Sequence, residues 1–352
     1  IMETIINLRQ FVKPEVVFGM GARKLAGQDA EKFSLKKVLL VTDEGIIKNG
    51  WVEDVIQSLD EAGIEYILFT ELTPNPKDFE VMLGAEYFKN NRCDGIIALG
   101  GGSPMDLAKG VGIISTNGGN IIDYKGVDMI TKAIPPMIFI PTTAGTSADV
   151  SQFGIISDTK KMVKVAIVSK NIIPDIALID YETTLTMDSY LTACTGIDAL
   201  THAIEAYVSK ASSPITDIHA MEAINIVYNY LPLVIKDPEN LKYREKMMFA
   251  SMEAGFALSN AILGAVHAMA HSLGGLLDLP HGECNGILLN HVVDFNYSSI
   301  PEKFNKISEI IGIKMHNYNP VEKRIILFDK LQEFKENIGI VKNLKELGVR
   351  EV

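Results

Sequence analysis

Five residues whose side chains commonly bind metal ions lie close together in the second half of the sequence. Asp198 and His202 are four residues apart in TGIDALTHAIEAY, and His267 and His271 repeat that spacing in GAVHAMAHSLGG. His281 follows soon afterwards in LPHGE. Residues four apart share one face of an α-helix. Burying imidazoles and a carboxylate in apolar surroundings is costly unless they have partners, and one divalent metal ion would serve all of them.

One carboxylate and three imidazoles suit Fe(II), Zn(II), Mn(II) or Ni(II). The alternative is that each histidine is a hydrogen-bonded core residue, which is the usual role of a lone histidine on an apolar helix. Two pairs within one apolar region favour the metal site. Among the other histidines, His219 and His291 belong to no motif, and His291 is the closer rival as a ligand.

A glycine-rich turn in the first half of the sequence is suited to binding a phosphate group. The segment GGGSPMD, from Gly100 to Asp106, follows an apolar run and precedes a helical pattern. Gly101 and Gly102 let a ligand approach the backbone, while Ser103 is a good N-cap and Pro104 suits the first helical position. The amide groups at the start of the helix would then face a pyrophosphate. The alternative is a tight turn before a capped helix, since the segment is not a GxGxxG motif.

Two further features support a dinucleotide site. The turn PTTAGTS places Thr142, Thr143 and Thr146 after a predicted strand, where hydroxyl groups can bind a dinucleotide. Asp43 ends another predicted strand and can accept hydrogen bonds from ribose hydroxyls. Because a carboxylate repels a 2′-phosphate, Asp43 favours NAD over NADP. The alternative role of Asp43 is a helix N-cap or a turn residue.

Strands and helices alternate through the first half of the chain. This order predicts a doubly wound α/β domain with a parallel sheet over residues 1–182, followed by an all-helical metal-binding domain over 183–352. Its predicted strands are 37–42, 64–70, 94–99, 136–140, 152–157, 163–169 and 175–179, and its predicted helices are 51–62, 78–90 and 104–115.

The composition excludes several classes of function. The 352 residues carry a formal net charge of -11, so we expect no nucleic-acid partner. The three cysteines are far apart and residues 1–10 lack the pattern of a signal peptide, which together predict a cytoplasmic protein. The uncharged stretch 254–277 is long enough to span a membrane, but its histidines favour a buried helix of a globular core.

Taken together, these segments resemble the iron-containing (group III) alcohol dehydrogenase family, in particular its 1,3-propanediol, lactaldehyde and butanol dehydrogenase-type members. The matching segments are GGGSPMD, PTTAGTSADVSQF, TGIDALTHAIEAYVS and GAVHAMAHSLGGLLDLPHG, and the resemblance covers nearly the whole chain. It implies a homodimer or higher homo-oligomer. The sequence stops at Val352, sooner than the resemblance leads us to expect, so we also expect a final helical segment to be missing.

The resemblance also assigns roles to individual residues. It implies that Asp198, His202, His267 and His281 are the metal ligands and that His271 lies beside them near the nicotinamide. The implied cofactor residues are Asp43, Gly101, Gly102, Ser103, Thr142 and Thr143, with Asn75, Phe153 and Lys164 lining the cofactor cleft. Asp106 and Thr146 lie in the same two turns and are also predicted to bind the cofactor.

The predicted reaction is reversible hydride transfer between NAD(H) and an alcohol or aldehyde, with Fe(II) favoured as the metal and Zn(II) possible. Residues 171–209 and 247–291 hold every proposed ligand and contain no lysine or arginine. An anionic substrate would require such a cation, so we expect a short neutral primary alcohol, diol or aldehyde. Two alternatives are a dehydroquinate synthase-like cyclase, whose anionic substrate would need basic residues, and a non-catalytic protein that binds a nucleotide and a metal.

Overall fold

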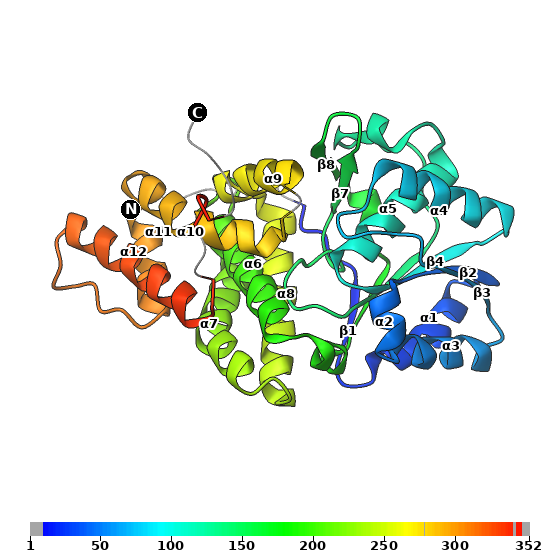
Figure 1. Cartoon of the computed structure of the whole chain (residues 1–352), viewed down its shortest axis with the longest axis horizontal. Coiled ribbons are helices and arrows are strands. Elements are labelled where there is room, and N and C mark those ends of the chain that lie inside the picture. The colour runs from blue at the N-terminus through cyan, green and yellow to red at the C-terminus, as the bar shows by residue number, and fades with distance from the viewer. Residues whose placement is uncertain (1–9, 278, 341–342, 347–352) are drawn as a thin grey trace.

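Six parallel strands form the main sheet of the N-terminal half (Figure 1). The computed structural model describes residues 10–277, 279–340 and 343–346. In spatial order the strands are β1 (Glu15–Phe18), β9 (Ile176–Ile179), β6 (Met137–Pro141), β4 (Gly95–Gly100), β2 (Lys37–Val41) and β3 (Glu65–Phe69). This sheet confirms the predicted doubly wound α/β fold.

Helices cover both faces of this sheet because successive side chains of a strand point to opposite faces. In β2, Val38 and Leu40 join a core with α1 (Ala26–Lys32) and α3 (Trp51–Glu61). Leu39 and Val41 point the other way, into a second core. That core includes residues of α4 (Asp78–Asn90) and α5 (Gly102–Asn117). The short helix α2 (Glu44–Lys48) follows β2 in the chain.

A small second sheet carries Phe153 and Lys164, the two residues predicted to line the cofactor cleft from this part of the chain. Its order is β5 (Gly126–Val127), β8 (Val163–Val168) and β7 (Phe153–Asp158), with β7 antiparallel to β8. The sequence predicted β7 and β8, whereas β5 is too short to leave a pattern. Short 3₁₀ helices complete the chain at Ala22–Leu25, Ile121–Tyr124, Lys170–Ile172, Tyr181–Thr186 and Tyr297–Ser299.

The C-terminal half is helical, and the described residues after β9 contain no strand. The central helices α6 (Ser189–Val208), α7 (Pro214–Lys236) and α8 (Leu241–Ala261) pack on one another around a single core. Around them lie α9 (Ala265–Leu277), α10 (His281–Asn296), α11 (Pro301–Ile310) and α12 (Pro320–Asn337). Helix α7 is long and apolar enough to cross a membrane, but its apolar residues belong to this core, and core helices of globular proteins have the same length and hydropathy.

The prediction of a single buried helix across residues 254–277 is wrong. Helix α8 ends at Ala261, and α9 begins at Ala265 after a bend of 102°. At the corner, Ile262 has a positive φ of 65°, which a β-branched residue rarely adopts. The apolar pattern continues through the corner although α8 is largely buried and α9 only in part, so the bend leaves no mark in the hydropathy.

The prediction that Ser103 caps a helix beginning at Pro104 is also wrong. Helix α5 begins at Gly102, with Gly101 as its N-cap. The chain turns into the helix directly after β4, and Ser103 therefore lies within the first turn. Its hydroxyl accepts a hydrogen bond from the backbone N–H of Asn75 instead, at 3.2 Å. The glycine turn still places the start of α5 at the carboxyl end of β4.

Candidate active site

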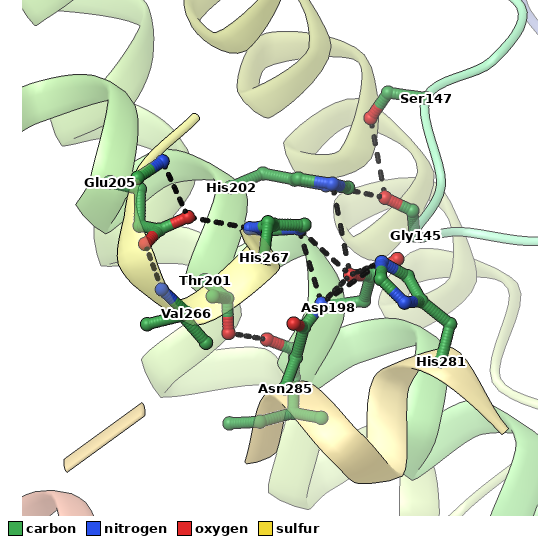
Figure 2. A network of polar contacts seen from close by, with 12 residues as sticks. Gly145, Ser147, Asp198, Thr201, His202, Glu205, Val266, His267, His281 and Asn285 are labelled. Carbon is green, nitrogen blue, oxygen red and sulfur yellow. Dashed lines mark hydrogen bonds and ion pairs between the residues drawn. The ribbon is translucent and has the colours of Figure 1, made fainter. Parts of the chain in front are cut away.

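Three helices bring the four predicted metal ligands together (Figure 2). Asp198 and His202 lie one turn apart on α6, His267 lies in the first turn of α9, and His281 is the first residue of α10. The ligand atoms of Asp198, His267 and His281 all lie within 4.8 Å of one another. The Nε2 atoms of His202, His267 and His281 lie 3.7, 3.5 and 3.8 Å from Oδ1 of Asp198. The carboxylate is therefore the centre of the group.

Hydrogen bonds fix the ring orientation of two of these histidines. Nδ1 of His202 lies 3.2 Å from the backbone carbonyl of Gly145, which can only accept a hydrogen bond. Nδ1 of His267 lies 2.6 Å from a carboxylate oxygen of Glu205. Both Nδ1 atoms therefore carry a hydrogen, and both Nε2 atoms face Oδ1 of Asp198. The two rings stack in parallel with their centroids 4.5 Å apart.

Electrostatics couple the four side chains, which are almost completely buried except for His281. Burial alone would raise the pKa of Asp198, but the three surrounding imidazoles hold that pKa far below its usual range. Burial lowers the pKa of His202 to about 4 and lowers that of His281 strongly. His267 differs, because Asp198 and Glu205 outweigh the effect of burial and raise its pKa to about 9. A metal binds the neutral imidazole, so it would take the place of the proton on Nε2 of His267.

A cavity of about 1190 Å³ connects this group to the glycine turn of the N-terminal half. Every residue predicted for the cofactor, the metal and proton transfer lines it. These residues are Asp43, Asn75, Gly101, Gly102, Ser103, Asp106, Thr142, Thr143, Thr146, Phe153, Lys164, Asp198, His202, His267, His271 and His281.

The glycine turn packs closely against the turn that carries Thr143 and Thr146. A Cβ atom on Gly101 would lie 3.2 Å from the side chain of Thr143, and one on Gly102 would lie 3.1 Å from that of Thr146. The two predicted turns therefore lie against each other at the carboxyl ends of β4 and β6. That edge of a parallel sheet is where doubly wound folds bind nucleotides.

Known proteins share both the sequence and the fold. Residues 13–181 match the model of the family described as iron-containing alcohol dehydrogenase, and residues 192–352 match the Fe-containing alcohol dehydrogenase family, C-terminal. The chain is 42% identical to the 1,3-propanediol dehydrogenase of Citrobacter freundii over 95% of this chain and 87% of that protein. The chain belongs to the iron-containing alcohol dehydrogenase family.

Two further comparisons agree with this membership. The NAD-dependent methanol dehydrogenase of Bacillus methanolicus is 36% identical, over 97% of this chain and 90% of that protein. A crystal structure of 1,3-propanediol oxidoreductase superposes with a TM-score of 0.94 at 40% identity, covering 98% of this chain and 90% of the other. The prediction of an NAD-dependent, metal-dependent oxidoreductase is thus confirmed, and the comparisons favour it over a cyclase or a non-catalytic protein.

As a member of this family, the chain has a donor set that fits a divalent metal. One carboxylate and three imidazoles converge in a buried space, and a cation would complete the coordination of Asp198 and balance its charge. Asn285 of α10 occupies the same space. Its Nδ2 donates to Asp198 Oδ1 at 2.6 Å and lies 3.1 and 3.3 Å from Nε2 of His267 and His281.

Neither Glu205 nor Asn285 was predicted from the sequence. Each had a signal in its spacing. Glu205 follows His202 by three residues on α6, and Asn285 follows His281 by four on α10, so each shares a helix face with a ligand. Neither signal is specific without knowledge of how α6, α9 and α10 pack.

His271 lies one turn beyond His267 on α9 and beside the metal-binding group. Its ring centroid is 4.9 Å from that of His281 and 6.2 Å from that of His267. Burial and the neighbouring His267 lower the pKa of His271 to about 4. His271 is therefore a neutral and weakly basic imidazole on the cavity wall.

Asp43 has the role of an N-cap as well as lining the nucleotide end. Its Oδ1 accepts hydrogen bonds from the N–H groups of Gly45 and Ile46, at 2.9 and 3.1 Å, at the start of α2. The described hydrogen bonds leave Oδ2 available for a ribose. Nearby, the amine of Lys164 donates to the Asn75 side chain at 2.7 Å.

On α5, Lys109 forms a charged group with Asp106, which lines the cavity, and with the buried Asp149; the sequence revealed neither Lys109 nor Asp149. The amine of Lys109 donates to the carbonyls of Ser151 and Phe153, at 2.9 and 2.6 Å. Burial lowers the pKa of Lys109 and raises those of Asp106 and Asp149. This group anchors α5 to the strand that carries Phe153.

The two rival histidines lie outside the cavity. His219 pairs with Glu253 at 2.6 Å, and His291 packs against Phe328 with ring centroids 5.6 Å apart. Neither residue lines the cavity described above.

Proposed function

We propose that Asp198, His202, His267 and His281 hold one divalent metal ion and that the glycine end of the same cavity holds NAD. The reaction is reversible hydride transfer between NAD(H) and a short primary alcohol, diol or aldehyde. The observation that carries this proposal is the single cavity that joins the four ligands to the glycine turn. Fe(II) is favoured by family membership, and Zn(II) suits the same donor set.

Each group of residues has a distinct task. When bound, the metal acts as a Lewis acid towards the substrate oxygen, and the nicotinamide exchanges the hydride. The helix start at Gly102 and the threonine hydroxyls orient the dinucleotide, while Asp43 accepts hydrogen bonds from its ribose. Gly145 and Glu205 bind Nδ1 of two ligand imidazoles, which turns Nε2 of each ring towards the proposed metal.

His271 has the task of moving the proton of the alcohol. Its imidazole is neutral and lies against His281 on the cavity wall. A neutral ring nitrogen can accept a proton from the substrate side and release it towards water. Replacing His271 should therefore lower the rate of alcohol oxidation without removing the metal.

The substrate is uncharged in this proposal. The helices that hold the ligands contribute no lysine or arginine in residues 171–209 and 247–291. The corner between α8 and α9 contributes apolar residues to the cavity, among them Leu258, Ile262 and Leu263. Lys164 is a cation on the cavity wall, and its amine is engaged with Asn75.

An NADH absorbance assay with butanal tests the proposal. The metal-loaded enzyme should oxidise NADH, a chelator should abolish the activity, and Fe(II) or Zn(II) should restore it. Full activity in His267→Ala would contradict the ligand assignment. Turnover that prefers a carboxylated or phosphorylated aldehyde over its neutral analogue would contradict the predicted substrate class.

We also propose that the enzyme is a cytoplasmic homo-oligomer, at least a dimer. The spaced cysteines support a reducing compartment, since Cys93, Cys194 and Cys284 are all unpaired and buried. Sedimentation velocity would test the oligomer, and a monomer at micromolar concentration would contradict it.

A further inference from the structure

We propose that Glu205 is the positioning residue of the metal site, because it holds both the ring of His267 and the start of the helix that carries it. The inference rests on the proposed metal site. Glu205 lies on α6, three residues after His202, and is buried with 5% of its side chain exposed. Figure 2 shows its carboxylate on the side of the His267 ring opposite Asp198.

Both carboxylate oxygens of Glu205 are engaged at the beginning of α9. Oε2 accepts from Nδ1 of His267 at 2.6 Å and from the N–H of Gly264 at 3.0 Å. Oε1 accepts from the N–H of Val266 at 2.7 Å. The first N–H groups of a helix lack partners within the helix, and a carboxylate there also interacts favourably with the helix dipole. One side chain therefore fixes the ligand and the helix together.

The corner before α9 is shaped around this carboxylate. A Cβ atom on Gly264 would lie 2.7 Å from Oε1 of Glu205, so a larger residue would displace the carboxylate or the corner. Two residues earlier, Ile262 adopts its positive φ, and the chain bends by 102° between α8 and α9. This geometry brings the first turn of α9 onto α6, where Asp198 and His202 already lie.

The negative charge and the acceptor geometry of Glu205 both matter for metal binding. All three groups that contact its oxygens are N–H donors. Glutamine has nearly the same shape, but its NH₂ group would face one of these donors and its charge is absent. Residues that orient metal-bound imidazoles in this way typically change metal affinity about 10–100-fold when mutated.

The chain offers a matched control. Glu253 lies 2.6 Å from Nδ1 of His219, the same distance as between Glu205 and His267, but that pair lies outside the cavity. The variant Glu253→Gln therefore removes a comparable carboxylate–histidine bond away from the ligands. It separates an effect on the metal site from a general loss of stability.

The experiment measures the Zn(II) dissociation constant of the full-length protein by competition with a chromophoric chelator, without NAD or substrate. Glu205→Gln should raise the dissociation constant about 10–100-fold. Glu253→Gln should leave it within about twofold of the wild type. With Co(II) as a second probe, the visible d–d spectrum should change for Glu205→Gln and not for Glu253→Gln.

Unchanged Zn(II) affinity in folded Glu205→Gln, or an equal loss in Glu253→Gln, would overturn the inference. If Glu205→Gln does not fold, Gly264→Ala keeps the charge but crowds Oε1. A weaker Zn(II) affinity in that variant would support the inference, and wild-type affinity would overturn it. Wild-type affinity in His267→Ala would instead show that the proposed metal site itself is wrong.

Discussion

Replacing Gly145 by alanine should weaken the binding of both the metal and NADH. Gly145 belongs to the turn PTTAGTS, whose threonines line the nucleotide end of the cavity, and its carbonyl accepts the hydrogen bond from Nδ1 of His202. One residue thus contacts a proposed metal ligand while its neighbours line the proposed dinucleotide site. Binding of the two ligands should consequently be linked, and the linkage must be reciprocal.

The structure sets the size of the perturbation. A Cβ atom on Gly145 would lie 2.4 Å from the backbone oxygen of Thr195, whereas ordinary contact begins at 3.4 Å. The obstacle is backbone of α6, so the turn must retreat by about 1 Å. The hydrogen bond to His202 is already 3.2 Å long and would exceed hydrogen-bonding distance. We expect metal affinity to fall about 10–100-fold, and overpacking to cost about 1–3 kcal/mol of unfolding free energy.

Two titrations measure this effect, one of Zn(II) by chelator competition and one of NADH by fluorescence. The control is Gly112→Ala in α5, where the nearest atom to the new Cβ is a flexible side-chain carbon of Ile134 at 3.3 Å. That variant should bind both ligands like the wild type. If Gly145→Ala folds and also binds both ligands with wild-type affinity, the turn does not hold His202 in place.

Three other perturbations have expected outcomes. Removing the metal with a chelator should lower the free energy of unfolding. The loss is about 2.7 kcal/mol relative to protein with free metal at 100 times the dissociation constant. An unchanged melting temperature in calorimetry would contradict this expectation. Asp43→Ala should raise the KM for NAD far more than that for NADP and cost about 1 kcal/mol of stability through the lost cap, so equal changes in the two KM values would argue against a ribose contact. Burial lowers the pKa of Lys335 to about 8, so wild-type stability should rise from pH 8 to 10.5, where the unfolded chain still holds a proton that the folded chain has lost. In Lys335→Met, urea denaturation should show a smaller rise of the unfolding free energy over this pH range. A pH profile identical to that of the wild type would contradict the lowered pKa of Lys335.

The sequence predicted five of the six strands of the parallel sheet, and β4, β6 and β9 among them are buried along their whole length, whereas the half-exposed β1 was missed. The run 37–42 extends one residue beyond β2, and the run 136–140 is shifted by one residue from β6. Apolar strands separated by amphipathic helices leave a local pattern that needs no tertiary information. The pair Asp198 and His202 could be predicted for the same reason, since both lie on one helix.

Features that depend on packing between distant segments could not be predicted. At the corner near Ile262, Glu205 of α6 binds the N–H groups of Gly264 and Val266 at the start of α9. The sequence around the corner continues the apolar pattern of a single helix. The roles of Glu205 and Asn285 arise where α6, α9 and α10 meet. Ser103 was misassigned because a serine before a proline usually caps a helix, whereas here the glycines allow the chain to turn earlier.

The measurement that tests the central claim most directly is anomalous diffraction from crystals of the Zn(II)-loaded enzyme, recorded on both sides of the zinc absorption edge. The proposed site predicts one strong anomalous peak per chain, about 2.0–2.2 Å from a carboxylate oxygen of Asp198 and from Nε2 of His202, His267 and His281. A peak bound by other residues, or a fully active enzyme without a peak at these four side chains, would contradict it.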